Sequence, residues 1–118
     1  MRYLILIHSN EAAEAVWREG GTERLDAAHA AVFQELATTG ELVDGNELDT
    51  TDVAVIGRHR GEAVTTVGPF TEGTEWIGGY YIVDVANRDR AVEIAGRLAE
   101  VEHAPIEIRR LMHEPPKV

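Results

Sequence analysis

Residues 2–8 carry an alternating pattern of large apolar side chains at the start of the chain. Leu4 and Leu6 point to one side of an extended backbone, and Ile5 and Ile7 point to the other. Because a strand with two apolar faces must be covered on both, the pattern predicts a strand in the middle of a sheet.

The apolar run is too short for a signal-peptide core, and no small-residue cleavage site follows it, so we expect a cytoplasmic protein.

The rest of the chain alternates between helical and extended patterns. These patterns predict helices over residues 11–18, 23–39 and 88–100, and strands over residues 41–48, 53–57, 63–67, 77–85 and 105–112. When the short first helix and the hairpin of residues 53–67 are set aside, the order of elements is βαββαβ. We therefore predict a single α+β domain over residues 1–118, with a ferredoxin-like fold into which a β-hairpin is inserted.

Residues with capping preferences mark the predicted helix ends. Asn10, Thr22 and Asn87 each precede a helix, and their side-chain oxygens accept hydrogen bonds from first-turn amides. Gly40 follows the second helix, at the position where a left-handed residue is favoured.

Helices on one face of such a sheet leave the other face bare. We predict that this bare face carries Tyr3, Ile5, Tyr80 and Ile82, whose apolar surface is large enough to require burial. Because no helix of the chain remains to cover this face, we expect a homodimer.

Charge and composition argue against several classes of partner and site. The formal net charge is −10, which repels phosphate backbones and anionic lipid surfaces, so we expect neither a nucleic acid nor a membrane as partner. The chain has no cysteine, which excludes disulfides, thiolate nucleophiles and zinc–thiolate sites. Its five histidines are scattered without the spacing of a metal-binding motif, so we expect no metal and no cofactor.

Three segments carry a resemblance to a known family: residues 42–45 (Leu-Val-Asp-Gly), 67–72 (Val-Gly-Pro-Phe-Thr-Glu) and 77–83 (Ile-Gly-Gly-Tyr-Tyr-Ile-Val). In order and spacing they resemble the YCII-related proteins, specifically the branch with a DGPF motif. The resemblance implies the dimeric α/β-barrel superfamily, in which two ferredoxin-like sheets pack face to face and a pocket lies between each sheet and its helices. This chain departs from the motif at Val67, where the family has Asp.

His29 is the strongest candidate for chemistry, because an imidazole in the apolar stripe of a helix needs a polar partner on the sheet. Asp44, on the strand that follows this helix, is the predicted partner, so that His29 and Asp44 form an acid/base pair. The alternative is a core histidine satisfied by a backbone carbonyl. Around the pair we expect a pocket for a small-molecule ligand, formed by His8, Phe33, Phe70, Glu72 and Tyr81.

Three functions are compatible with these features, the third of them a plain dimeric interaction module. The first is an enzyme that carries out acid/base chemistry of lyase or isomerase type on a small, aromatic or cyclic metabolite. The second is a non-catalytic ligand-binding or regulatory dimer, which the missing Asp at Val67 favours. The resemblance implies a link of such a dimer to a sigma-factor system, since many relatives are encoded beside extracytoplasmic-function sigma factors.

Overall fold

The structure is a computed structural model that describes residues 1–67 and 75–113. In this part of the chain the strands are β1 (Arg2–Asn10), β2 (Leu42–Glu47), β3 (Ala54–His59), β4 (Glu62–Val67), β5 (Glu75–Asp84) and β6 (Ile106–Arg110). The helices are α1 (Glu11–Gly20), α2 (Glu23–Thr39) and α3 (Arg88–Gly96), followed by a short 3-10 helix, η1 (Ala99–Glu102).

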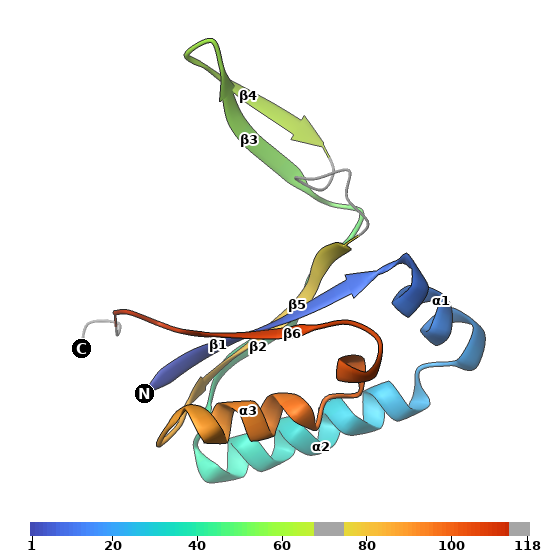
Figure 1. Cartoon of the computed structure of the whole chain (residues 1–118), viewed down its shortest axis with the longest axis vertical. Helices are drawn as coiled ribbons and strands as arrows, with labels where there is room; N and C mark the ends of the chain where they lie inside the picture. The colour runs from blue at the N-terminus through green and yellow to red at the C-terminus, as the bar shows by residue number, and fades with distance from the viewer. Residues whose placement is uncertain (68–74, 114–118) are drawn as a thin grey trace.

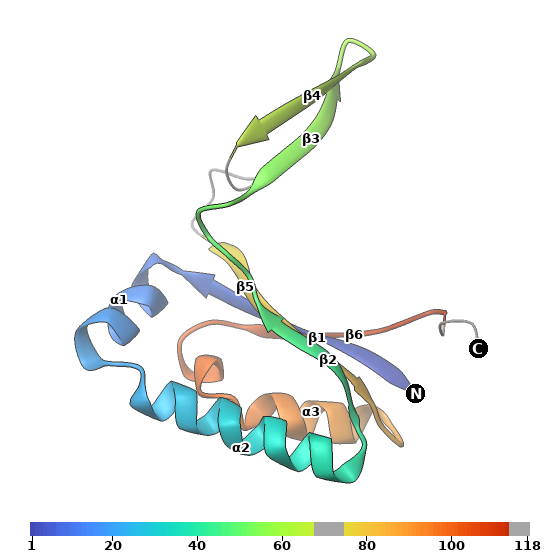
Figure 2. The same cartoon turned by 180° about the vertical axis from the view of Figure 1, so that it is seen from behind.

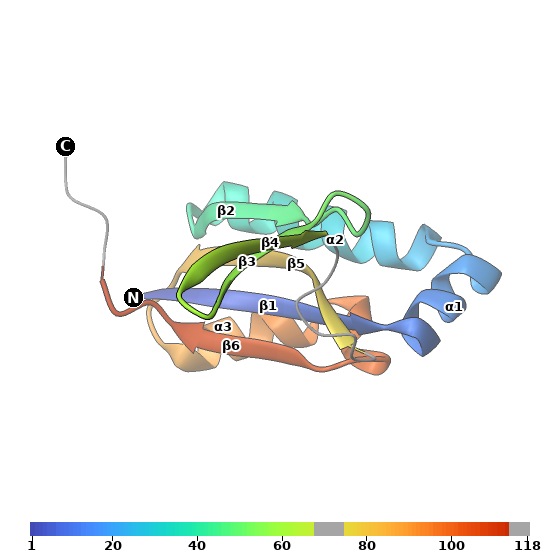
Figure 3. The ribbon, with the colours of Figure 1, turned by 90° about the horizontal axis from the view of Figure 1, so that it is seen from above.

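The N-terminal strand is central, as its two apolar faces predict. It lies between β5 and β6 in an antiparallel sheet of order β2-β5-β1-β6. Helices α2 and α3 both lie on one face of this sheet, and in the described part of the chain no helix covers the other face (Figures 1 and 3). This arrangement confirms the predicted α+β, ferredoxin-like fold.

The two sheet faces are composed differently from the prediction. Tyr3 and Ile5 are 6% and 0% exposed and belong to the core beneath the helices, so their predicted place on the bare face is wrong. Side chains alternate with a period of two, and the β1–β5 register sets the even-numbered residues of both strands opposite one another. The open face therefore carries Leu4, Leu6, Tyr80 and Ile82.

The core fixes the position of helix α2 over the sheet. Val32 and Leu36 are 1% and 0% exposed and pack against the buried face of the central strands. His29 precedes them at spacings of three and seven residues, which places it on the same side of the helix. The helix therefore directs the His29 imidazole toward the sheet.

Three of the four predicted capping residues act as expected. The side-chain oxygens of Asn10 and Asn87 accept hydrogen bonds from backbone amides in the first turns of α1 and α3. Gly40 ends α2 in the left-handed conformation, with φ of 78°. Thr22 makes no such bond to the backbone, because its hydroxyl donates instead to the carboxylate of Asp26 at 2.9 Å.

The last helix is shorter than its pattern predicts. α3 ends at Gly96, and Leu98 adopts an extended conformation while remaining 1% exposed. The chain then turns into η1, which carries Glu100. Burial of Leu98 against the core thus interrupts the helix and redirects the residues that follow it.

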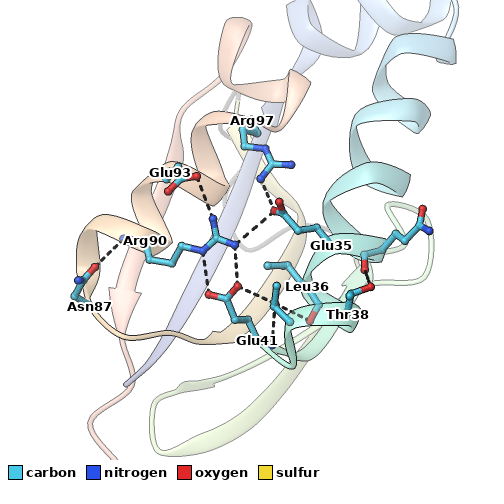
Figure 4. Close-up of polar contacts among 10 residues, drawn as sticks. Glu35, Leu36, Thr38, Glu41, Asn87, Arg90, Glu93 and Arg97 are labelled. Carbon is cyan, nitrogen blue, oxygen red and sulfur yellow. Dashed lines mark hydrogen bonds and ion pairs between the residues drawn. The ribbon is translucent and has the colours of Figure 1, made fainter.

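An ion-pair cluster joins α3 to the end of α2 and the start of β2 (Figure 4). The Arg90 guanidinium donates to Glu41 through Nε at 3.0 Å and Nη2 at 2.8 Å, and it also contacts Glu35 and Glu93. Arg97 pairs with Glu35 as well. Hydrogen bonding from Arg90 lowers the pKa of Glu41, so this carboxylate stays ionised at neutral pH.

The inserted hairpin forms a sheet of its own. β3 and β4 pair with each other and extend away from the four-stranded sheet (Figures 1 and 2). Ile56 of this hairpin is 72% exposed. The Cα radius of gyration, 16.2 Å, exceeds the value of about 13.5 Å for a compact chain of this length.

Within the described residues no helix has the length and apolarity to cross a membrane.

Candidate functional site

The His29 imidazole is held between two side chains from distant parts of the sequence. Its Nδ1 lies 2.7 Å from the Tyr81 hydroxyl on β5, and its Nε2 lies 2.5 Å from Oε2 of Glu100 on η1. The imidazole and phenol rings also stack, with centroids 5.8 Å apart and an interplanar angle of 15°. Tyr81, His29 and Glu100 therefore form a continuous hydrogen-bonded chain, which we call the Tyr–His–Glu unit.

The environment of Tyr81 keeps the proton on its phenol. Burial, reinforced by the negative charge of Glu100, raises the pKa of the Tyr81 phenol above its ordinary value. The phenol is therefore protonated at neutral pH. In the imidazole tautomer that carries its proton on Nε2, Nδ1 accepts a hydrogen bond from the phenol and Nε2–H donates to Glu100.

This unit borders a cavity between the sheet, α1, α2 and η1. The cavity has a volume of about 470 Å³ and is lined by His29, Tyr81 and Glu100 together with His8 and Phe33. A volume of this size suits a small organic molecule. The structure thus brings together four of the predicted site residues, His29, His8, Phe33 and Tyr81. Phe70 and Glu72, also predicted for the pocket, lie outside the described residues.

Asp44 is not the partner of His29, so the predicted pairing of these two residues is wrong. Leu42 pairs with Val83 on the helix-covered face, but a β-bulge between Leu42 and Asp44 sets Asp44 opposite Ile82 on the open face. Without the bulge, the period of two would place Asp44 on the same face as Leu42.

On the open face Asp44 has a different partner. It accepts a hydrogen bond from the Tyr80 hydroxyl at 2.9 Å. This bond, with burial and the charge of Asp44 adding to it, raises the pKa of the Tyr80 phenol. Asp44 and Tyr80 are therefore a polar pair on the surface that the helices leave uncovered.

His8 lies at the edge of the cavity and pairs with a separate carboxylate. Its Nε2 is 3.1 Å from Oε1 of Glu107 on the neighbouring strand β6. The β1–β5 register shifts between Ile7 and His8, and pairing then continues from His8 to Asn10. Across residues 1–67 and 75–113, no group of three or more His, Asp or Glu side chains is arranged to hold a metal ion.

Sequence reasoning missed two residues that shape the Tyr–His–Glu unit, Glu100 and Gly45. Glu100 was expected at the end of a continuous helix, and only the break at Leu98 carries its carboxylate to His29. Gly45 contributes by its lack of a side chain, since a Cβ atom there would lie 2.8 Å from Cδ1 of Tyr81. The acidic Glu100 directly after the apolar pair Leu98 and Ala99 was a usable signal, whereas nothing local distinguishes Gly45.

Two comparisons with known proteins identify relatives of this chain. A curated relative, an uncharacterized protein of Rhizobium meliloti (strain 1021), is 31% identical over 100 residues, which cover 84% of this chain and 81% of the relative. The family model of the YCII-related domain matches residues 1–114, and therefore includes every element of the sheet and the Tyr–His–Glu unit. This chain belongs to the YCII-related family.

Proposed function

We propose that this protein is an enzyme that carries out acid/base chemistry, of lyase or isomerase type, on a small aromatic or cyclic metabolite. The observation that carries the proposal is the Tyr–His–Glu unit at the wall of a cavity of about 470 Å³. A hydroxyl, an imidazole and a carboxylate joined in this order form the arrangement by which proteins move a proton to and from a bound molecule. A cytoplasmic location, expected from the sequence, is part of the proposal.

In this proposal each of the three groups has a distinct role. Both nitrogens of His29 are occupied, so Tyr81 is the group that meets the substrate. As the phenol oxygen takes a proton from the substrate, its own proton passes to Nδ1 of His29. Glu100, 2.5 Å from Nε2, stabilises the imidazolium that forms. Reversal of these transfers returns a proton to the substrate at another position, or to a leaving group.

The proposal is tested by proton exchange and by the titration of Tyr81. Incubation in D₂O with a panel of aromatic and cyclic metabolites should show protein-dependent deuterium incorporation by mass spectrometry. Tyr81→Phe and His29→Asn should each lower the exchange rate by about 10² or more, since each interrupts the transfer. Glu102→Gln is the matched control, because this exposed carboxylate pairs with Arg24 and lies outside the cavity lining.

The second test, the titration of Tyr81, does not require the substrate. Burial and, after it, the charge of Glu100 raise the pKa of Tyr81. Glu100→Gln should therefore lower the phenol pKa measured by ultraviolet absorbance, whereas Glu102→Gln should not. A Tyr81 pKa that is the same with and without Glu100 would show that the unit is not coupled. Coupling without exchange on any metabolite that binds would favour the alternative, a ligand-binding or regulatory domain in which Val67 replaces the family Asp.

We also propose that the protein acts as a homodimer through the open face of the sheet. Leu4, Leu6, Tyr80 and Ile82 form an apolar surface there, and the described part of the chain provides no helix to cover it. The hairpin of β3 and β4 supports the same proposal, because an isolated two-stranded sheet is marginally stable in water. A second copy of the chain supplies a matching apolar face.

A further inference from the structure

The charge of the cavity lining indicates which class of molecule the cavity accepts. We propose that it binds an organic cation, namely a protonated amine attached to a flat apolar group, and that it discriminates against anions. The inference rests on the proposed function in taking this cavity as the substrate site, but it concerns binding and not proton transfer.

The first argument is the excess of carboxylates around the cavity. Glu14, Asp26, Glu47 and Glu100 line it, and they come from α1, α2, β2 and η1 respectively. Within the described part of the chain, no arginine or lysine contributes to this lining. Four elements thus direct negative charge at the same space, and an anion placed there would meet repulsion without a compensating arginine or lysine.

The second argument is that the partners of these carboxylates orient them without neutralising them. Glu14 accepts a hydrogen bond from the Ser9 hydroxyl at 3.0 Å, and Asp26 accepts one from the Thr22 hydroxyl at 2.9 Å. Both donors are uncharged, so the negative charge of each carboxylate remains available to a ligand. Glu100 bonds to His29 through Oε2, while its Oε1 is buried with no hydrogen-bond partner in the described structure.

The third argument is the aromatic part of the lining. Trp17, Phe33 and Tyr81 come from α1, α2 and β5 and border the cavity together with the carboxylates. Aromatic faces attract both flat apolar groups and cations, and the second attraction is electrostatic. Carboxylates and aromatic rings in one small cavity are the combination that recognises an ammonium group joined to a ring.

The experiment compares three probes that share one ring and differ in charge: benzylamine, benzyl alcohol and benzoate. Dissociation constants are measured at neutral pH and low salt by chemical-shift titration of the indole N–H of Trp17. We expect benzylamine to bind at least about tenfold more tightly than benzoate, with benzyl alcohol between them. The preference should decrease as salt is added.

Two variants test whether the preference comes from the cavity. Glu14→Gln and Asp26→Asn remove one negative charge each from the lining, keep a side-chain oxygen as acceptor, and should each reduce the preference about threefold or more. Glu93→Gln removes the same charge from an exposed position on α3 that is not part of the lining, and should leave the preference unchanged.

Three results would overturn the inference: benzoate binding as tightly as benzylamine, no binding of benzylamine up to about 10 mM, or an equal loss of preference in Glu93→Gln and Asp26→Asn. The last result would assign the effect to the overall charge of −10 and not to the cavity. The proposed function is tested by a different measurement. It fails if the pKa of Tyr81 is the same with and without Glu100, whichever of the three probes binds. An amine preference retained in Tyr81→Phe supports the inference in either case.

Discussion

Substitution of Gly45 by alanine provides the sharpest test of how the site is built, because it leaves every polar group in place. A Cβ atom at this position would lie 2.8 Å from Cδ1 and 3.1 Å from Cε1 of Tyr81, and 3.3 Å from the backbone oxygen of Tyr80. Carbon atoms in contact are normally about 3.5 to 4.0 Å apart. The Tyr81 ring must therefore move by about 0.7 Å or more.

The loss of stability expected for Gly45→Ala follows from the close packing around the Tyr81 ring. Tyr81 is 7% exposed, and its hydroxyl is held 2.7 Å from Nδ1 of His29. Overpacking of a buried site of this kind costs about 1 to 3 kcal/mol. For a domain of this size, about 1 kcal/mol lowers the melting temperature by about 4 °C, so we expect Gly45→Ala to melt about 4 to 12 °C below the parent protein. The same displacement is large enough to break the bond to His29.

Circular dichroism gives the melting temperature, and ¹⁵N NMR of the imidazole reports the loss of the bond at Nδ1. Gly57→Ala is the matched control, because it is also a strand glycine and its added Cβ would have no atom within 4 Å. Tyr81→Val in the Gly45→Ala background removes the ring that causes the clash, so the two changes together should cost less than their sum. If Gly45→Ala melts within about 1 °C of the parent and the His29 resonances do not move, the steric reasoning is refuted.

Two further predictions concern stability and assembly. Arg90→Ala should lower the free energy of unfolding by about 2 kcal/mol in urea denaturation at pH 7, because the Arg90 side chain is only 22% exposed and its loss leaves Glu41 without its cation. This contact lowers the pKa of Glu41 from an ordinary 4.5. The ion pair therefore stabilises the fold above that pH, and the stabilisation is lost as the pH falls through the lowered pKa. The unfolding free energies of the two proteins should converge in acid, and a difference that stays constant with pH would contradict the assignment. Light scattering should give twice the 13.0 kDa chain mass. Leu6→Glu on the open face should reduce the measured mass to that of one chain. A parent protein that is monomeric at micromolar concentration would refute the homodimer.

Local features of the sequence were sufficient for the elements and for much of the architecture. The alternation of residues 2–8 predicted the central strand, and Asn10, Asn87 and Gly40 marked helix ends that the structure confirms. These features are readable because a cap or an apolar face depends on residues within one or two turns, or on a fixed period along the chain. The ferredoxin-like order of strands followed from the same local patterns.

The composition of the site depended on contacts that no local pattern contains. His29 is identifiable as an imidazole within the apolar stripe of α2, but its partners Tyr81 and Glu100 lie 52 and 71 residues away. A single bulged residue between Leu42 and Asp44 moved the predicted partner to the opposite face, and burial of Leu98 broke a helix and brought Glu100 into position. A shift of one residue in register reverses the face of every side chain that follows it, and its energy is decided by packing across the sheet. The sequence by itself therefore determined the order of the strands and helices and pointed to the imidazole, whereas only the tertiary structure decided which groups meet it.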